Sequence, residues 1–296
     1  MNNESRNPVV SWIWKIPAIT IAYFIGVVIS GGVITAAKMQ WPSFPQSTSQ
    51  TNEFVISFIT SIIMAVCLAL LARGIRASQT VRWLILTAFT YVTFGLNNQI
   101  EAAIFTTYGG TATMLLFFIL PCAFGAAAAV YLFRPEESGT PVENSITGQP
   151  ASGWLWRVAV AWLAFPVIYI FFGMLAAPLV VPVYQTMDFG LTLPGFETMI
   201  PVALARSALY LAVTLPILMT WSRSRRSLLW SLAVAFFAMM GLIGLLSATF
   251  FPPVLRVTHT IEILGDAIVY AWLLVALFIP KARHEVKEAA PVVVDS

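Results

Sequence analysis

The sequence predicts an all-α integral membrane protein with eight transmembrane helices, arranged as two parallel four-helix repeats. Three observations predict this fold class: an apolar composition, eight long apolar runs and a similarity between the two halves of the chain. Of the 296 residues, 59% are hydrophobic and 10% are charged, whereas soluble domains carry about 25% charged residues. The mean hydropathy is +0.84. The lipid bilayer is therefore the expected surrounding of most of the chain.

Eight segments have the length and composition of membrane spans. A helix that crosses a bilayer needs about 20 predominantly apolar residues. Runs of this kind are found at residues 16–37, 54–74, 83–105, 112–133, 155–183, 200–221, 227–250 and 258–280. The last run meets the criterion only if the polar residues in its first third are tolerated. Cys67 and Cys122 lie inside the runs without a CxxC motif, so buried free thiols are expected.

Lysine and arginine residues predict the orientation, because they accumulate on the cytoplasmic side of membrane proteins. With eight spans, 13 of the 16 Lys and Arg residues lie on the side that carries both termini. Lys38 and Arg256 lie on the opposite side, and Arg206 lies within a span. We therefore predict cytoplasmic N- and C-termini in a plasma membrane of the bacterial inner-membrane type. The basic run 222–226 follows the same rule, so no nucleic-acid partner is expected.

The two halves of the chain are similar in sequence. Residues 11–31 align with 153–173, including paired tryptophans, and residues 95–105 align with 241–251. Four spans per repeat is an even number, so both repeats have the same orientation, as in some transporters. The predicted organisation is a first four-span repeat (1–138), a cytoplasmic linker (139–153), a second four-span repeat (154–283) and a disordered cytoplasmic tail (284–296).

Ionisable side chains interrupt the outer half of the last span. Helical geometry places His259, Glu262, Asp266 and Tyr270 on one face, within an arc of about 80°. The matching helix of the first half, 114–133, carries no charge in its apolar part. Spanning the membrane therefore does not require this polar stripe.

Two other spans carry polar groups at a similar depth. Asn97 and Glu101 lie one turn apart in the third span, and Arg206 and Tyr210 lie one turn apart in the sixth. A charge at mid-bilayer costs about 2.5–3.5 kcal/mol, so these residues should face inward and pair. As the only cation buried in the bundle, Arg206 is expected to pair with Glu262 or Asp266. Arg256 is expected to pair with Glu101 or with a carboxylate of an external loop.

The candidate site therefore comprises nine residues. They are Asn97, Glu101, Arg206, Tyr210, Arg256, His259, Glu262, Asp266 and Tyr270. In one interpretation, an ion pair between Arg206 and a carboxylate only stabilises the bundle. In a second, the residues line an outward-facing cavity for a small polar ligand, cation or proton, as in a transporter or a ligand sensor. His259 suits this role because the ordinary pKa of imidazole lies near neutrality.

A third interpretation is a metal site in a membrane-embedded hydrolase that acts at the outer leaflet. Its ligands would be His259, Glu262 and Glu101, since imidazole and carboxylates suit zinc, manganese or iron. The sequence contains no HExxH motif to support it. It also lacks a P-loop, a dinucleotide-binding fingerprint and a haem-binding CxxCH, so no cofactor is expected.

The predicted orientation can be tested at Gln46, which lies in the first external loop. A cysteine at this position should react with an impermeant thiol reagent in intact cells, whereas the two native cysteines should stay unlabelled in lipid-buried runs. Labelling that appears only after lysis would place this loop in the cytoplasm and reverse the topology.

Overall fold

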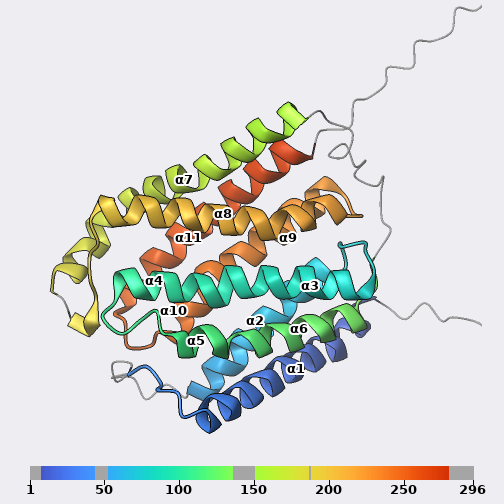
Figure 1. Cartoon of the computed structure of the whole chain (residues 1–296), viewed down its shortest axis with the longest axis horizontal. Coiled ribbons are helices and arrows are strands. Elements are labelled where there is room, and N and C mark those ends of the chain that lie inside the picture. Colours follow the sequence, from blue (N-terminus) through green and yellow to red (C-terminus); the bar gives the residue numbers. More distant parts are fainter. Residues whose placement is uncertain (1–7, 44–52, 136–150, 187, 280–296) are drawn as a thin grey trace, which may run out of the picture.

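The computed structural model describes residues 8–43, 53–135, 151–186 and 188–279. This part of the chain is helical and contains no strand, apart from two isolated backbone bridges. Figure 1 shows the helices side by side along one common direction. Seven helical stretches are long and apolar enough to cross a membrane: Ser11–Ala36, Glu53–Ala72, Ala112–Leu132, Ser152–Gln185, Phe196–Thr220, Arg225–Ser247 and Pro253–Phe278. The prediction of an all-helical protein is therefore confirmed for the described residues, and the length and composition of these seven stretches support a multi-pass membrane protein.

The predicted spans correspond to the helices in chain order. Five of them are single helices: α1 (Pro8–Ala36), α2 (Glu53–Ala72), α7 (Ala151–Gln185), α8 (Phe196–Thr220) and α11 (Pro253–Phe278). The other three are built from shorter pieces. The third span comprises α3 (Gln79–Thr90), π-helical η1 (Tyr91–Leu96) and α4 (Asn97–Phe105), and the fourth comprises α5 (Ala112–Phe117) and α6 (Ile119–Leu132). The seventh comprises α9 (Arg225–Phe237), π-helical η3 (Ala238–Leu242) and α10 (Ile243–Ser247). A 3₁₀ turn, η2 (Asp188–Gly190), lies between α7 and α8.

The third predicted span, 83–105, differs from the others. It forms one helical run through α3, η1 and α4, yet it is not among the seven apolar stretches. The reason is a cluster of polar residues in α4, namely Asn97, Asn98, Gln99 and Glu101, which lowers its mean hydropathy. The run nevertheless packs inside the bundle, against α6 and α8. In Figure 1, α1 begins and α11 ends at the same end of the bundle.

The two halves of the chain pack in the same way. In the first half α1 packs against α2 and α6, and in the second half α7 packs against α8 and α11. The halves meet where α2 contacts α9, where α3 contacts α8, and where η1 contacts η3. Counted from the start of each half, the second helical run of one half thus contacts the third run of the other half, and the two third runs contact each other.

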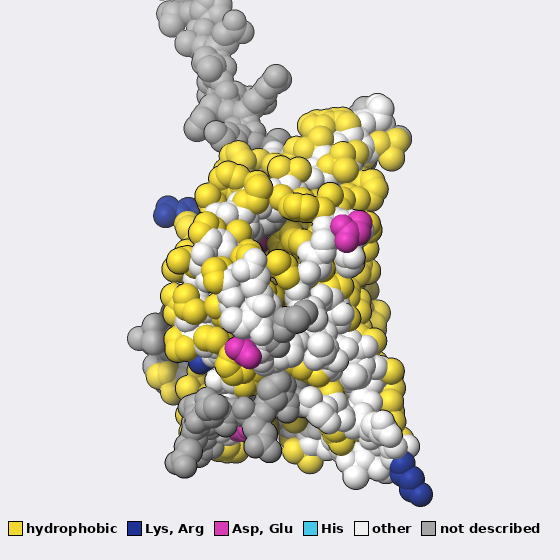
Figure 2. Space-filling model, turned by 90° about the vertical axis from the view of Figure 1, so that its left-hand side faces the viewer, with side chains coloured by type: hydrophobic (Ala, Val, Ile, Leu, Met, Phe, Trp, Pro, Cys, Tyr) yellow, Lys and Arg dark blue, Asp and Glu magenta, His cyan; other side chains and the backbone are white. Residues whose placement is uncertain are grey.

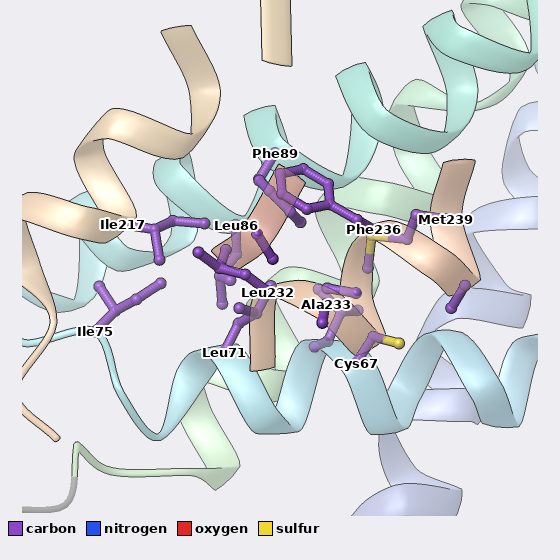
Figure 3. Close-up of a cluster of buried hydrophobic side chains, with 14 of the residues drawn as sticks. Cys67, Leu71, Ile75, Leu86, Phe89, Ile217, Leu232, Ala233, Phe236 and Met239 are labelled. Atoms are coloured by element: carbon purple, nitrogen blue, oxygen red, sulfur yellow. The ribbon is translucent and has the colours of Figure 1, made fainter. Parts of the chain in front are cut away.

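A buried apolar cluster fills the interface between the halves, as Figure 3 shows. Leu71 of α2 and Phe89 of α3 lie beside Leu232 and Phe236 of α9, and all four are fully buried. The rings of Phe89 and Phe236 lie 5.6 Å apart. In lipid the hydrophobic effect contributes little between helices, so close packing of such side chains stabilises this interface.

The turns after α2 and α8 interlock next to this cluster. Ile75 and Trp221 form an antiparallel bridge. The Arg76 amide donates to the Thr220 carbonyl at 2.8 Å, and the Ser222 amide donates to the Gly74 carbonyl at 2.8 Å. A Cβ on Gly74 would lie 2.2 Å from the Trp221 ring, so any larger residue there would force this ring to move.

Arg82 is buried as well, which corrects the expectation that Arg206 is the only buried cation. Arg82 is 4% exposed and donates to the carbonyls of Ala72 at 2.7 Å and Phe133 at 2.6 Å. These carbonyls lie at the C-terminal ends of α2 and α6, where the backbone lacks helical partners and the helix dipole favours a cation. Arg225 has the same role at the C-terminal end of α11, where its Nε atom donates to the Ile279 carbonyl.

Local geometry also repeats between the third helical run of the first half and the third run of the second half. Ser78 accepts a hydrogen bond from the Val81 amide at the start of α3, and Ser224 accepts one from the Ser227 amide at the start of α9. Both helices then pass into a π-helical turn, η1 or η3. Each of these turns includes a glycine of the aligned pair, Gly95 or Gly241.

The interlock at Gly74 leads to a stability prediction. Gly74→Ala should lower the free energy of unfolding by about 1–3 kcal/mol, because the added methyl group forces Trp221 away. The measurement is the fraction of detergent-purified protein that stays monodisperse after heating. Gly31→Ala is the matched control, because a Cβ on Gly31 meets no atom within 4 Å. Equal stability of the two variants would contradict the interlock.

Candidate functional site

A cavity of about 560 Å³ lies between the two halves of the bundle. Its walls include Ser57 near the start of α2, Phe105 at the end of α4 and Leu255 near the start of α11. The cavity thus lies toward the bundle end that the sequence predicts to face outward. Figure 2 looks onto this end, where hydrophobic and uncharged groups form most of the described surface and charged side chains are few.

Three of the nine predicted residues line this cavity: Glu101, His259 and Glu262, here called the cavity group. The Nδ1 atom of His259 lies 2.5 Å from the Oε2 atom of Glu262, as their spacing of three residues on α11 permits. The Tyr184 hydroxyl of α7 lies 3.4 Å from the other ring nitrogen, Nε2. The imidazole is therefore held between a carboxylate and a phenol, and either nitrogen can carry the proton.

Arg206 lies behind Glu101 and is only 3% exposed. Its guanidinium donates to Glu101 Oε1 at 2.5 Å and to the Tyr210 hydroxyl at 3.3 Å from Nε. Tyr210 donates to the Asn97 side-chain oxygen, and the Asn97 amide donates to the Met240 carbonyl at 3.1 Å. These side chains, here called the interhelix network (Glu101, Arg206, Tyr210 and Asn97), join α4, α8 and η3.

Aromatic rings complete the surroundings of Arg206. The guanidinium carbon lies 5.1 Å from the ring centre of Tyr169 and 5.7 Å from that of Phe165, both on α7. Cation–π contacts of this kind contribute about 0.5–2 kcal/mol, with the larger values in desolvated sites. Arg206 is thus surrounded by a carboxylate, a hydroxyl and two ring faces of the protein itself.

The partner predicted for Arg206 was wrong. The expectation was Glu262 or Asp266 of α11, whereas the structure pairs Arg206 with Glu101 of α4. The reason is helix adjacency: α8 packs against α3, η1 and α4, while α11 packs mainly against α7 and α9. Glu262 pairs with His259 instead.

Asp266 and Tyr270 continue the predicted stripe on α11 into the bundle, away from the cavity walls. Asp266 is 2% exposed, and its Oδ1 atom has no hydrogen-bond partner among the described residues. Tyr270 is fully buried, with its ring 5.2 Å from that of Phe165 and 5.7 Å from that of Phe236. As predicted, His259, Glu262, Asp266 and Tyr270 thus lie on one face of α11, which is turned toward the inside of the bundle.

Arg256 does not join the other eight residues. Its Nε atom donates to the Leu245 carbonyl at 2.9 Å, and a terminal nitrogen donates to the Leu246 carbonyl at 3.4 Å. It therefore caps the end of α10, and the predicted pairing with Glu101 or a loop carboxylate is not formed. The neighbouring side chains belong to a separate, smaller surface pocket.

The three predicted metal ligands share the cavity without forming a metal site. Across the described ranges, no three His, Cys, Asp or Glu side chains come close enough together to hold a metal ion. One oxygen of Glu101 is committed to Arg206, and one oxygen of Glu262 is committed to His259. The arrangement favours ion pairing within the protein over metal coordination.

Sequence reasoning missed two tyrosines of α7 that face the cavity. Tyr184 contacts His259, and Tyr169 lies over Arg206 while lining the cavity wall. α7 has no charged residue beyond Arg157, so its sequence gave little reason to choose one face. One signal in the sequence could have indicated this face. Tyr169 carries a polar hydroxyl group far from either end of α7, a helix that is otherwise apolar enough to face lipid.

The loops at the cavity mouth are joined across the two halves. Thr106 and Leu191 form an antiparallel bridge, with the Thr107 amide donating to Gly190 at 2.9 Å and the Thr192 amide donating to Phe105 at 2.8 Å. Leu191 and Thr106 both line the cavity. These loops therefore form one edge of its entrance.

Comparisons of the chain with models of protein families, with curated proteins and with solved structures gave no match.

The pairing of Arg206 with Glu101 can be tested by a double-mutant cycle. Arg206→Met and Glu101→Gln should each destabilise the protein, whereas the double variant should lose less than the sum. We expect a coupling free energy of about 1–3 kcal/mol. This is below the 3–5 kcal/mol cost of breaking a fully buried pair, because the Glu101 side chain is 28% exposed. Strictly additive losses in thermal stability would show that the two residues do not interact.

Proposed function

We propose that this protein binds a small ligand from the outer side of the membrane, as a transporter-like or ligand-sensing protein. One observation carries the proposal: a cavity at the predicted outer end, with Glu101, His259 and Glu262 in its wall. Cavities of about 300–1,000 Å³ with a few polar groups in an apolar lining are typical of small-molecule sites. Its ligand would be a small polar molecule, a cation or a proton.

The proposal includes eight membrane crossings with both termini in the cytoplasm. It is supported by the common end at which α1 begins and α11 ends, because an odd number of crossings would separate them. The run from Gln79 to Phe105, the third in chain order, is then added to the seven apolar stretches and makes eight crossings. Its polar residues face the cavity and α8. The distribution of Lys and Arg supports a plasma membrane of the bacterial inner-membrane type.

The proposal also includes an internal duplication with a pseudo-two-fold axis along the membrane normal. Three features support it: equivalent helix packing in both halves, the paired π-helical turns η1 and η3, and the paired serine caps Ser78 and Ser224. The linker 139–153 and the tail 284–296 lie largely or entirely outside the described residues.

A purely structural role describes part of the polar set. Arg206, Tyr210 and Asn97 are buried, hydrogen-bonded to one another and absent from the cavity wall. His259 and Glu262 reach the cavity and make no hydrogen bond to the interhelix network. We therefore propose that the interhelix network holds the helices together and that the cavity group contacts the ligand. Glu101 belongs to both groups. The hydrolase alternative gains no such support from the geometry.

The proposal is tested by asking whether the cavity opens outward. Ser61→Cys is nearly isosteric and places a thiol in the cavity wall of α2. In intact cells it should react with small impermeant methanethiosulfonates, both the trimethylammonium-ethyl and the sulfonato-ethyl reagent. Ser30→Cys is the matched control, because Ser30 is buried on α1 and does not line the cavity. Absence of labelling at position 61 by both reagents would overturn the proposed function.

A further inference from the structure

We infer that the ligand of this cavity is an organic cation with an apolar body, bound in competition with protons. This inference rests on the proposed function, since it assigns a chemical class to the ligand of that same cavity.

The charge of the cavity wall favours a cation. Among the described residues that line it, Glu101, Glu262 and His259 are the only ones with an acidic or basic side chain, and no Lys or Arg is present. Arg206 is buried behind Glu101. An anion would thus face two carboxylates with no lysine or arginine in the wall to balance it, whereas a cation would meet complementary charge.

The balance of buried charge points the same way. Glu101, Glu262 and Asp266 supply three carboxyl groups, and Arg206 supplies one permanent positive charge that pairs with Glu101. The remaining carboxyl groups need a proton or another cation, because an uncompensated charge in a membrane interior is costly. His259 can carry one such proton beside Glu262. A bound cation would supply the same compensation, so cation and proton compete.

The titratable groups around this proton come from α7, α4 and α11. Tyr184 and Tyr169 face it from α7, Glu101 from α4 and Asp266 from the next turn of α11. The lining residues from η3 and α10 are Gly241, Ile243, Gly244, Leu245 and Ser247, none of which titrates. Since the pair lies in the cavity wall, we expect a proton displaced from it by a cation to leave through the cavity.

The rest of the wall favours an apolar, organic cation over a metal ion. Aromatic side chains supply much of it, including Phe94, Phe105, Phe118, Tyr169, Tyr184 and Phe251. Ring faces attract cations whose charge is spread over a weakly hydrated group. Calcium and magnesium instead require about six or more oxygen ligands, which this lining does not provide. A volume of about 560 Å³ accommodates a multi-ring molecule.

The test uses two ions of the same shape and opposite charge, tetraphenylphosphonium and tetraphenylborate. Full-length protein in detergent is examined by equilibrium dialysis, with empty micelles as the blank. We expect saturable binding of tetraphenylphosphonium that weakens several-fold as the pH falls from 8 to 6, because protons then compete with the cation for the cavity group. Tetraphenylborate should show no saturable component. Saturable tetraphenylborate binding of equal affinity, or phosphonium binding that is independent of pH, would overturn the inference.

Two variants assign the binding to the cavity. Glu262→Gln should weaken phosphonium binding at least tenfold and remove its pH dependence, with nearly unchanged thermal stability. Glu197→Gln is the control, because Glu197 is an exposed acid in the first turn of α8 outside the cavity. Unchanged binding by Glu262→Gln would contradict the inference, as would an equal loss in both variants.

The thiol reagents provide a measurement that does not depend on the folding of Glu262→Gln. At Ser61→Cys, the cationic reagent should react at least several times faster than the anionic one, after correction for their rates with a free thiol. Equal corrected rates, or a faster anionic reagent, would contradict cation selectivity while leaving an outward-open cavity in place. Reaction of neither reagent would reject the proposed function itself, so the two failures are distinguishable.

Discussion

The contact between Arg206 and Glu101 is the interaction on which the arrangement of the polar helices depends. A guanidinium 3% exposed to solvent must be balanced by protein groups, and the carboxylate that balances it lies on a helix of the other half of the chain. Tyr210 and Asn97 extend this contact to the Met240 carbonyl of η3. The polar run from Gln79 to Phe105 is therefore held inside the bundle by its own side chains, although its composition is less apolar than that of the other spans.

This network also explains how one cluster of ionisable residues can serve two purposes. Arg206 turns one carboxylate oxygen of Glu101 inward, while the Glu101 side chain keeps 28% of its surface exposed toward the cavity. His259 and Glu262 form a separate pair on α11. Structural and ligand-binding interpretations of the cluster are thus compatible, because they apply to residues on opposite sides of Glu101.

Much of this arrangement could be predicted from the sequence, because apolar run length and helical periodicity depend on local order. The spans, the inward stripe of His259, Glu262, Asp266 and Tyr270, and the pairing of Arg206 with Tyr210 one turn away follow from such spacing. The partner of Arg206 and the place of Arg256 did not follow, since they depend on which helices are neighbours and on free carbonyls at the end of α10. The contribution of α7 through Tyr169 and Tyr184 was hidden for the same reason: its neighbours decide which side of an apolar helix faces a cavity.

The interlocked turns at Gly74 and Trp221 have a consequence for the kind of protein this is. The bundle is hollow at one end and tightly closed at the other, where the bridge between Ile75 and Trp221 adjoins the buried cluster of Figure 3. Carrying a ligand through the membrane requires opening this closed end, with rupture of its backbone hydrogen bonds and separation of Leu71 and Phe89 from α9. Sensing a ligand requires no such step. The energetic barrier that separates a receptor from a carrier is therefore concentrated in two short turns at the end of the bundle opposite the cavity.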